Sequence, residues 1–475
     1  MTLSFSGPGG ANRRWTLAVT SIAFFMVALD ALVVITALPA IQRDLGSTIT
    51  TLEWTINAYT LAFAAGIITA AALGDRLGRR RVFVGGVATF TIASAACALA
   101  PTVELLIIAR CVQGLGAAAI LPLSLTILAA AFPPERRGTI VGIWGGIAGI
   151  AVASGPLVGG ALTQGLDWHW IFWVNVPIGV ATAIAGRARL AESFGPPTRL
   201  DLPAVALVTG GAVSLAYGLV RAGELGFSSP EVVGTLGLGL LLIVAFVGWE
   251  ARSREPMLPL GLFRSPGFAA AVMSSFLLSA ALVSAAFLGV QFFQFAQGDG
   301  PFVTGLRVLP WTATPVIVAP LAGLLSDRVG RRPVMVLGLL LQGLGLLWLS
   351  AVARVGVAYP ALMVPLVVAG VGVSMALPTT ATAAVSAVAP RDMGKASGVN
   401  GTLQRFGTVF GVSLVSIVFA ANGHLGSPAS YAAGFAPAMA TSGLLSLVGA
   451  VTALGTPGRR AAMAAETRPA SQLAS

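Results

Sequence analysis

The sequence predicts an all-α polytopic membrane protein with fourteen transmembrane helices, and three observations support this prediction. The 475-residue chain is 56% hydrophobic and only 9% charged, whereas a soluble domain carries about 25% charged residues. Its apolar residues gather in fourteen runs of about 20 residues, the length that spans a hydrocarbon core of about 30 Å. Basic residues follow every second run, as expected for a chain that crosses a membrane back and forth. Soluble fold classes are therefore excluded.

The fourteen runs are joined by short connections that leave no room for a sizeable soluble domain. Their expected bounds are 15–37, 54–74, 82–100, 103–125, 138–161, 170–190, 202–221, 231–250, 267–291, 303–325, 333–352, 359–384, 398–420 and 433–455. The domains that follow are a cytoplasmic tail at 1–14, a six-helix bundle at 15–190, two extra helices with linkers at 191–265, a second six-helix bundle at 266–455 and a cytoplasmic tail at 456–475.

The net charge of +11 is explained by membrane topology. With the N-terminus inside, the cytoplasmic segments hold 22 of the 28 basic residues and the outer segments hold four. Lys and Arg are retained on the cytoplasmic side of a bilayer. We therefore expect a multi-pass protein of the plasma (inner) membrane with both termini in the cytoplasm. The distribution indicates a lipid bilayer, and no nucleic acid, as the partner of the basic residues.

An internal repeat places the same basic loop after the second and the tenth runs. It reads LGDRLGRR at Leu73–Arg80 and LSDRVGRR at Leu325–Arg332, at an offset of 252 residues. Parallel repeats are typical of secondary transporters. Two six-helix halves alone would put the second copy after the eighth run. Two extra helices, within 202–250, are therefore expected between the halves.

The repeated loop is predicted to be a conformational latch. Its glycines permit a tight turn between antiparallel helices, and Asp75 can accept hydrogen bonds from N–H groups at a nearby helix start. The arginines can pair with acids of the facing half. The alternative is a solvated loop whose charge only sets topology. The latch residues are Asp75, Arg76, Gly78, Arg79 and Arg80 in the first copy, and Asp327, Arg328, Gly330 and Arg331 in the second.

The sequence contains four further motifs in addition to the repeated loop. They are Leu29–Pro39 (LDALVVITALP), Arg110–Ala118 (RCVQGLGAA), Gly155–Gly160 (GPLVGG) and Trp168–Gly179 (WHWIFWVNVPIG). Together they resemble signatures of the major facilitator superfamily, and the first and last resemble those of its fourteen-helix drug:proton antiporters. GPLVGG is similar to an element associated with exporters. The resemblance implies a major facilitator fold and proton-coupled efflux of drug-like molecules, antibiotics or secondary metabolites by alternating access.

Asp30 and Arg110 are predicted to form a proton-coupling pair. Of the 17 acids only Asp30 is expected deep in the membrane, where a carboxylate costs about 2.5–3.5 kcal/mol or more. Burial there can bring protonation of a carboxyl into the working range. At 1.5 Å per residue, Asp30 and Arg110 lie at the same depth, about 20 Å from the cytoplasmic surface. Gln113 shares a helix face with Arg110. The alternative is a static ion pair that only fixes packing.

The candidate substrate-lining residues are polar and aromatic side chains within the runs, as expected for a pocket that binds drug-like molecules. They are Asn57, Gln113, Trp144, Gln291, Phe293, Gln294, Trp311, Asn400 and Arg405. Packing or lipid contact is the alternative for each aromatic side chain. An arginine within the membrane, such as Arg405, is a functional candidate by default.

The fifth run is predicted to contain a gate between the two halves. Its glycines let neighbouring helices approach closely, and its proline can kink the helix. The gate residues are Gly155, Pro156, Gly159 and Gly160. Close packing is common in membrane helices, so the assignment as a gate comes mainly from the resemblance.

The residue types argue against an enzyme. The two cysteines, Cys97 and Cys111, and the two histidines do not form a cluster with metal-ligand spacing, and no glycine-rich loop precedes a lysine. We expect no cofactor and no metal, with the proton gradient as the driving force. The expected partners are a small-molecule substrate and protons, and the expected functional unit is a monomer. Two alternatives stay open: proton-coupled import of a small nutrient, and a non-transporting membrane sensor.

Overall fold

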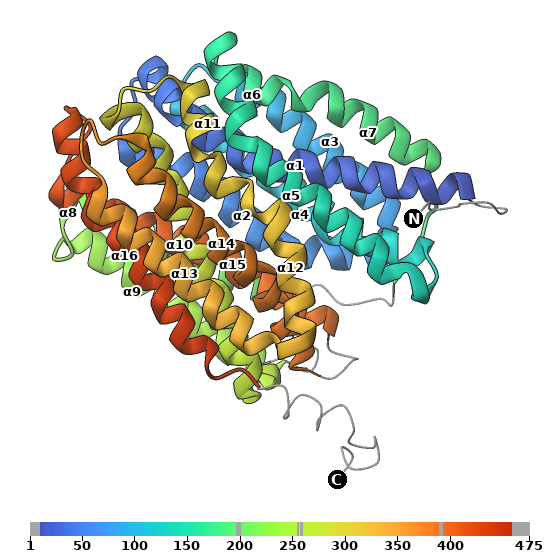
Figure 1. The fold of residues 1–475 in the computed structure, drawn as a ribbon. Coiled ribbons are helices and arrows are strands. Elements are labelled where there is room, and N and C mark those ends of the chain that lie inside the picture. Colours follow the sequence, from blue (N-terminus) through green and yellow to red (C-terminus); the bar gives the residue numbers. More distant parts are fainter. Residues whose placement is uncertain (1–9, 196–200, 254–255, 257–259, 389–392, 458–475) are drawn as a thin grey trace.

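The computed structural model describes residues 10–195, 201–253, 256, 260–388 and 393–457. Every regular element in these ranges is a helix (Figure 1). The N-terminal bundle contains α1 (Gly10–Leu45), α2 (Ile49–Leu77), α3 (Arg79–Ala98), α4 (Val103–Ala131), α5 (Pro134–Gly165), α6 (Trp170–Trp173) and α7 (Asn175–Arg189). The middle of the chain forms α8 (Leu202–Leu225) and α9 (Pro230–Arg252). The C-terminal bundle contains η1 (Leu260–Arg264), α10 (Pro266–Gln291), η2 (Phe292–Ala296), α11 (Pro301–Thr312), α12 (Thr314–Val329), α13 (Arg331–Val352), α14 (Tyr359–Ser386), α15 (Met393–Asn422) and α16 (Pro428–Ala453).

Twelve helical spans among the described residues are long and apolar enough to cross a membrane, and the bent α2 raises the number to 13. The prediction of an all-α, multi-pass fold is confirmed. The predicted total of fourteen is reached only if α5, with 32 residues, is added to these spans. α1 begins at Gly10, within the segment 1–14 that was expected as a tail, and its apolar span begins at Arg13.

The predicted span 303–325 contains a local interruption of the helix between α11 and α12. Pro315 lies in the first turn of α12 and has no N–H to continue the helix. Thr314 compensates in part, because its hydroxyl donates to the backbone oxygen of Trp311 at 2.7 Å. Side-chain hydroxyls commonly satisfy such freed carbonyl groups inside membranes. The two helices still form one continuous span, 301–329.

The two extra helices lie beside the seam between the bundles. α8 packs on α2 of the N-terminal bundle and on α15 of the C-terminal bundle, whereas α9 packs mainly on α8. At this seam Leu61 of α2, Ala216 of α8 and Val409 of α15 form one buried apolar cluster. Figure 1 shows α8 and α9 at the margin of the molecule, away from α6 and α7. The chain thus inserts a helical pair between its halves, as the position of the repeat predicted.

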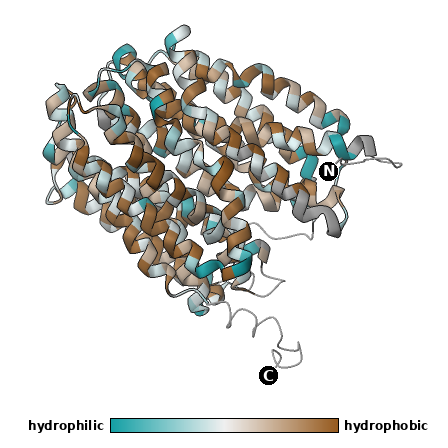
Figure 2. Cartoon of the chain, viewed as in Figure 1, coloured by the Kyte–Doolittle hydropathy of each residue, from teal (hydrophilic) through white to brown (hydrophobic). Residues whose placement is uncertain are grey.

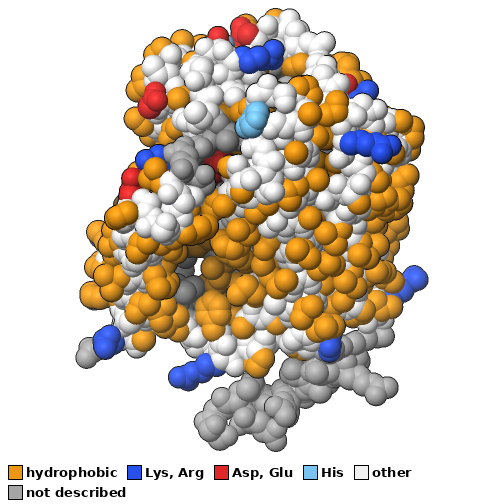
Figure 3. Space-filling view, turned by 90° about the vertical axis from the view of Figure 1, so that its left-hand side faces the viewer, with side chains coloured by type: hydrophobic (Ala, Val, Ile, Leu, Met, Phe, Trp, Pro, Cys, Tyr) orange, Lys and Arg blue, Asp and Glu red, His pale blue; other side chains and the backbone are white. Residues whose placement is uncertain are grey.

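The outer surface of the bundles is suited to lipid. Large apolar side chains such as Ile92, Ile108, Leu241 and Val451 are at least 60% exposed. Hydrophobic residues run along the helices in Figure 2, and hydrophilic residues concentrate near their ends. In Figure 3 hydrophobic side chains cover the middle of one face, with charged side chains toward its two ends. Such a band matches the hydrocarbon core of a bilayer.

Candidate functional site

Asp30 and Arg110 form an ion pair inside the N-terminal bundle. Asp30 lies on α1 and Arg110 on α4, and Arg110 Nη1 is 2.6 Å from Asp30 Oδ2. The Asp30 side chain is 0% exposed and that of Arg110 2%. Arg110 Nε also donates to the backbone oxygen of Thr55 on α2 at 3.1 Å. Its guanidinium carbon lies 4.1 Å from the centroid of the Tyr59 ring. Three helices therefore meet at this charge pair.

Two amide side chains hold the other oxygen of Asp30. Gln113 Nε2 donates to Asp30 Oδ1 at 2.9 Å, and Asn175 Nδ2 of α7 donates to the same atom at 3.1 Å. Both amides also donate to Ser94 Oγ of α3, at 3.3 and 3.1 Å. Gln113 was expected beside Arg110, but sequence reasoning missed Asn175 and Ser94. The signal for Asn175 was an amide within the otherwise apolar segment WVNVP.

Three side-chain donors surround the carboxylate of Asp30. Both carboxylate oxygens are engaged by donors, one by Arg110 and the other by Gln113 and Asn175. A buried charge is stable only when it is paired and hydrogen-bonded. Protonation of Asp30 would remove the negative charge that these three donors stabilise and would weaken their hydrogen bonds to the carboxyl group. Protonation would also leave the buried Arg110 without its counter-charge.

Burial of acids is not confined to Asp30. The side chains of Glu53 and Glu250 are each 2% exposed. Both lie near helix ends, Glu53 in the second turn of α2 and Glu250 two residues before the end of α9. The expectation that Asp30 is the one acid far from a helix end is consistent with these positions. An expectation based on sequence depth missed their burial, because neighbouring helices cover side chains even near helix ends.

The first basic loop forms its hydrogen bonds and ion pairs within its own bundle. Glu192, in the segment after α7, accepts the backbone N–H of Arg80 at 2.8 Å in the first turn of α3. Asp75 pairs with Arg79 one turn away at 2.8 Å. In this conformation Glu192, and not Asp75, accepts the helix-start N–H, and the ion pairs that these arginines form among the described residues lie within the N-terminal bundle. The segment folds back because Arg79 N donates to Ser193 O at 2.9 Å.

The second loop has the same backbone turn and also contacts its own bundle. Gly78 has φ 110° and Gly330 has φ 93°, a region that favours glycine. Arg331 Nη1 donates to Ser386 Oγ at the end of α14 at 2.9 Å. The other latch candidates are exposed: Arg76, Asp327 and Arg328. In this conformation each loop joins neighbouring helices of its own bundle.

The predicted gate residues lie where α5 packs on α1 of its own bundle and on α11 of the C-terminal bundle. Gly159 packs against the backbone of Val33 on α1, and Gly155 against the side chain of Leu32. Gly160 packs against the backbone of Pro301 and Phe302 at the start of α11. In the other direction, Gly305 of α11 packs on the backbone of Pro156 and Leu157. A methyl group added at Gly159, Gly160 or Gly305 would overlap backbone atoms, so α5 can approach α1 and α11 only because these residues lack side chains.

The substrate-lining candidates do not converge on one pocket. Gln113 belongs to the Asp30 cluster, and Trp144 stacks on Phe24 with ring centroids 3.9 Å apart. Gln291 donates to the backbone of Phe287 in its own helix. Asn400 is buried on α15. The predicted set was chosen by residue type and depth, and helix rotation places its members on different faces.

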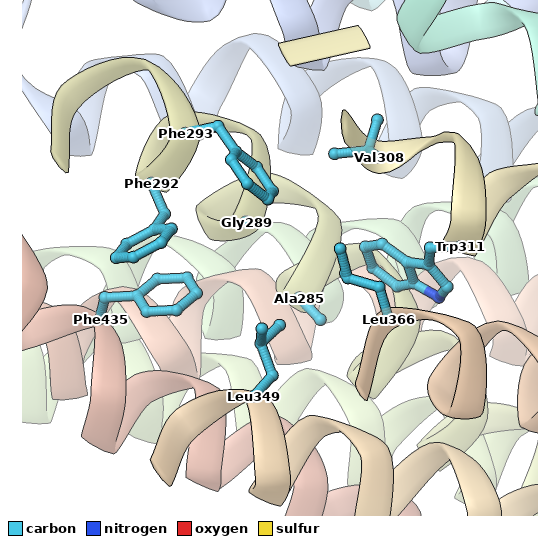
Figure 4. Close-up of a pocket in the computed structure, with 9 residues that line it drawn as sticks. All are labelled: Ala285, Gly289, Phe292, Phe293, Val308, Trp311, Leu349, Leu366 and Phe435. Atoms are coloured by element: carbon cyan, nitrogen blue, oxygen red, sulfur yellow. The ribbon is translucent and has the colours of Figure 1, made fainter. Parts of the chain in front are cut away.

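Phe293 and Trp311 do line one cavity, in the C-terminal bundle (Figure 4). Its other walls include Phe292 and Phe435, whose rings stack at 4.4 Å, and Leu349. The cavity measures about 10 Å³, close to the volume that a single water needs. All nine lining residues are apolar apart from the indole nitrogen of Trp311. A drug-sized ligand would need several hundred Å³, so the bundle must rearrange to bind one here.

Four hydrogen bonds join the two bundles among the residues that the structure describes. Gln294 Nε2 donates to Thr36 O at 2.8 Å, and Phe302 N donates to Gln164 Oε1 at 3.0 Å. Asn57 Nδ2 donates to Ser413 Oγ at 3.4 Å, and Thr312 Oγ1 to Ala153 O at 3.4 Å. Gln164 and Phe302 lie at the same end of the molecule, at the C-terminal end of α5 and the start of α11. The bundles are held together at this end.

Comparison with known proteins gives consistent results. The sequence profile described as "Major Facilitator Superfamily" matches residues 20–313 and 297–472. The chain is 32% identical over 416 residues to the tetracenomycin C resistance and export protein of Streptomyces glaucescens, covering 87% of this chain and 77% of that protein. It is 36% identical over 415 residues to the multidrug resistance protein Stp of Mycobacterium tuberculosis (86% and 76% covered). It is 32% identical over 472 residues to a methylenomycin A resistance protein of Streptomyces coelicolor (97% of each covered).

The fold has solved counterparts at low sequence identity. A crystal structure of an auto-inhibited POT family peptide transporter superposes with a TM-score of 0.71 at 15% identity, covering 97% of this chain and 99% of that one. At this identity the similarity establishes the fold alone.

Proposed function

Because the chain belongs to the Major Facilitator Superfamily and is a membrane transporter rather than an enzyme, we propose that it exports drug-like molecules or antibiotics in exchange for protons. Its relatives are named as resistance and export proteins. The observation that supports proton exchange is the buried cluster of Asp30, Arg110, Gln113 and Asn175, which places one carboxylate among movable donors.

The proposed cycle uses Asp30 as the proton carrier. A proton from outside neutralises Asp30, and the freed Arg110, Gln113 and Asn175 rearrange. α4 and α7 both pack on α1, which contacts α10 and α11 of the C-terminal bundle, so rearrangement of these residues can change the packing at the seam through α1. Release of the proton inside restores the ion pair and resets the bundle. No cofactor takes part, and the proton gradient supplies the driving force.

Arginine placement supports an orientation with both termini in the cytoplasm of a plasma membrane. In that orientation the contacts of Gln164 with Phe302 and of Gln294 with Thr36 close the outer side. The proposed exporter then opens by parting α5 from α11 at the predicted gate. A monomer is sufficient for this motion, since each bundle is contributed by the same chain.

The proposal is tested with the purified protein in liposomes that carry a pH indicator and an imposed pH gradient. A panel of antibiotics and dyes is offered on the side that corresponds to the cytoplasm. We expect substrate to move against proton flow, and addition of substrate to accelerate dissipation of the gradient. Movement of substrate in the same direction as the protons would indicate an importer. Failure of every compound to move would contradict the proposal.

A further inference from the structure

Arg405 lies in the middle of α15, twelve residues after its first residue in a helix of 30. Its guanidinium carbon is 4.2 Å from the centroid of the Phe63 ring on α2. The two helices belong to different bundles, so this contact crosses the seam. The side chain is only partly buried, whereas Phe63 is 1% exposed. Arg405 is therefore partly exposed and lies against an aromatic ring of the other bundle.

Within the part of the chain that the structure describes, no carboxylate forms an ion pair with Arg405. The contrast with Arg110 is direct, because Arg110 has Asp30 at 2.6 Å. A lone guanidinium at this depth is costly. Cation–π contact with Phe63 offsets only part of that cost. Among the described residues, the charge of Arg110 is therefore balanced by an ion pair, whereas that of Arg405 is not.

An aromatic pair connects the two arginines. Tyr59 lies under Arg110, with the guanidinium carbon 4.1 Å from its ring centroid. Tyr59 meets Phe63 edge-on at 5.9 Å, and Phe63 faces Arg405. The Tyr59 hydroxyl is buried and has no hydrogen-bond partner among the described residues. It can donate to an acceptor that enters the seam, as can the guanidinium of Arg405.

On the basis of the proposed export function, we propose that Arg405, with Tyr59 and Phe63, forms an anion-recognition subsite, and that the substrates are amphiphilic organic anions. The guanidinium binds a carboxylate through two parallel N–H donors. Phe63 supplies an apolar surface for the body of the substrate. Arg405 is here a binding residue, distinct from the proton-carrying Asp30.

The charge of the substrate determines how transport responds to membrane potential. Export of a monoanion in exchange for one proton moves two positive charges inward in total. An inside-negative potential alone should therefore drive export of an anion without a pH gradient. A monocation exchanged for one proton carries no net charge and should show no such response.

The test compares two fluorescent probes, anionic carboxyfluorescein and monocationic ethidium, in liposomes that contain the purified protein. We expect Arg405→Gln to lower carboxyfluorescein export at least tenfold and to leave ethidium export within twofold. Arg405→Lys keeps the charge and should retain part of the export. Arg43→Gln, at an exposed arginine on the end of α1, is the matched control. A potassium–valinomycin potential should drive carboxyfluorescein export by the wild type and not by Arg405→Gln.

Each result decides the proposal. An equal loss of both probes in Arg405→Gln would assign the side chain to packing and overturn the subsite. Export of ethidium alone by the wild type would overturn the subsite while leaving proton-coupled export intact. Export of neither probe, together with no export of the antibiotic panel, would overturn both proposals.

Discussion

Asn175 on α7 donates a hydrogen bond to Asp30 on α1 at 3.1 Å, across 145 residues of sequence. The bond places α7 in direct contact with the charge pair. Asn175 also bonds to Ser94 of α3 at 3.1 Å, which fixes the orientation of its amide. The Asp30 cluster therefore includes a residue outside the α1–α4 pair.

Replacing Asn175 by leucine should lower proton-driven efflux about tenfold or more. A hydrogen bond to a charged group contributes about 1.5–3 kcal/mol, and leucine leaves Asp30 with one donor fewer. Efflux and substrate-induced proton flux should be measured together in liposomes, so that slowed transport is separated from uncoupled transport. Asn422→Leu, at an exposed asparagine on the end of α15, serves as the control. Unchanged efflux and coupling in Asn175→Leu would remove Asn175 from the mechanism.

Asp30→Asn should abolish proton-driven efflux, because an amide cannot load a proton at working pH. It should also destabilise the protein by about 3–5 kcal/mol, the cost of leaving a buried partner charge unpaired. The double variant Asp30→Asn with Arg110→Gln removes both charges. It should recover part of the thermal stability but none of the proton-driven efflux. Recovery of efflux in the double variant would show that the pair serves only packing.

Gly160→Ala should disfavour closure of the outer end. A Cβ at this position would lie 2.9 Å from Phe302 Cα and closer to the Pro301 backbone. Overpacking costs about 1–3 kcal/mol, which corresponds to a shift of roughly 5- to 150-fold toward the open state. Spin labels at Leu166 and Val303 would report the separation of the bundles. Gly149→Ala, on the same helix with no atom within 4 Å of the added Cβ, should leave the distance distribution unchanged.

Glu192→Ala should loosen the first basic loop and lower stability by about 1–3 kcal/mol. The variant leaves the N–H of Arg80 without its acceptor and removes an anion from the N-terminus of α3. Glu192→Gln keeps a hydrogen-bond acceptor and should lower the stability of the protein by less. Thermal unfolding of the detergent-solubilised protein measures the difference, with Glu104→Gln at an exposed position as the control. Equal stability of all three variants and the wild type would contradict this role.

Asp299, in the loop between η2 and α11, should make stability depend on pH. Burial raises the pKa of its carboxyl, and Arg307, whose Nη1 lies 2.7 Å from Oδ2, acts in the opposite direction. The folded chain then holds the proton more tightly than the unfolded chain. Stability should fall as pH rises from the ordinary carboxyl pKa, about 3.9, through the raised value. Asp299→Asn should flatten this part of a thermal-unfolding profile. An identical profile for Asp299→Asn and the wild type would rule out this contribution.

Much of the architecture could be predicted because it depends on quantities that run along the chain. Hydrophobic length sets the spans, and the two basic loops at Leu73–Arg80 and Leu325–Arg332 reveal the repeat and the two inserted helices. Depth is also a linear quantity, so counting residues placed Asp30 and Arg110 at one level. The structure has their side chains 2.6 Å apart.

Sequence reasoning did not reach contacts that depend on helix rotation and on the path of connections. The partner of the first basic loop is Glu192, because the segment after α7 folds back over it. The lining candidates Trp144 and Gln291 had suitable types and depths, yet they face their own bundles. Neither outcome follows from hydropathy or spacing.

The sequence by itself determined that this is a multi-pass helical membrane protein with a duplicated half, and that Asp30 and Arg110 lie at matching depths. Only the tertiary structure decided that Asn175 and Ser94 complete the Asp30 cluster, that α5 wedges between α1 and α11, and that Arg405 crosses the seam to Phe63. The physical reason is that a bilayer constrains position along the membrane normal through hydrophobicity. Rotation and neighbour choice within the membrane depend on side-chain packing between segments far apart in the chain.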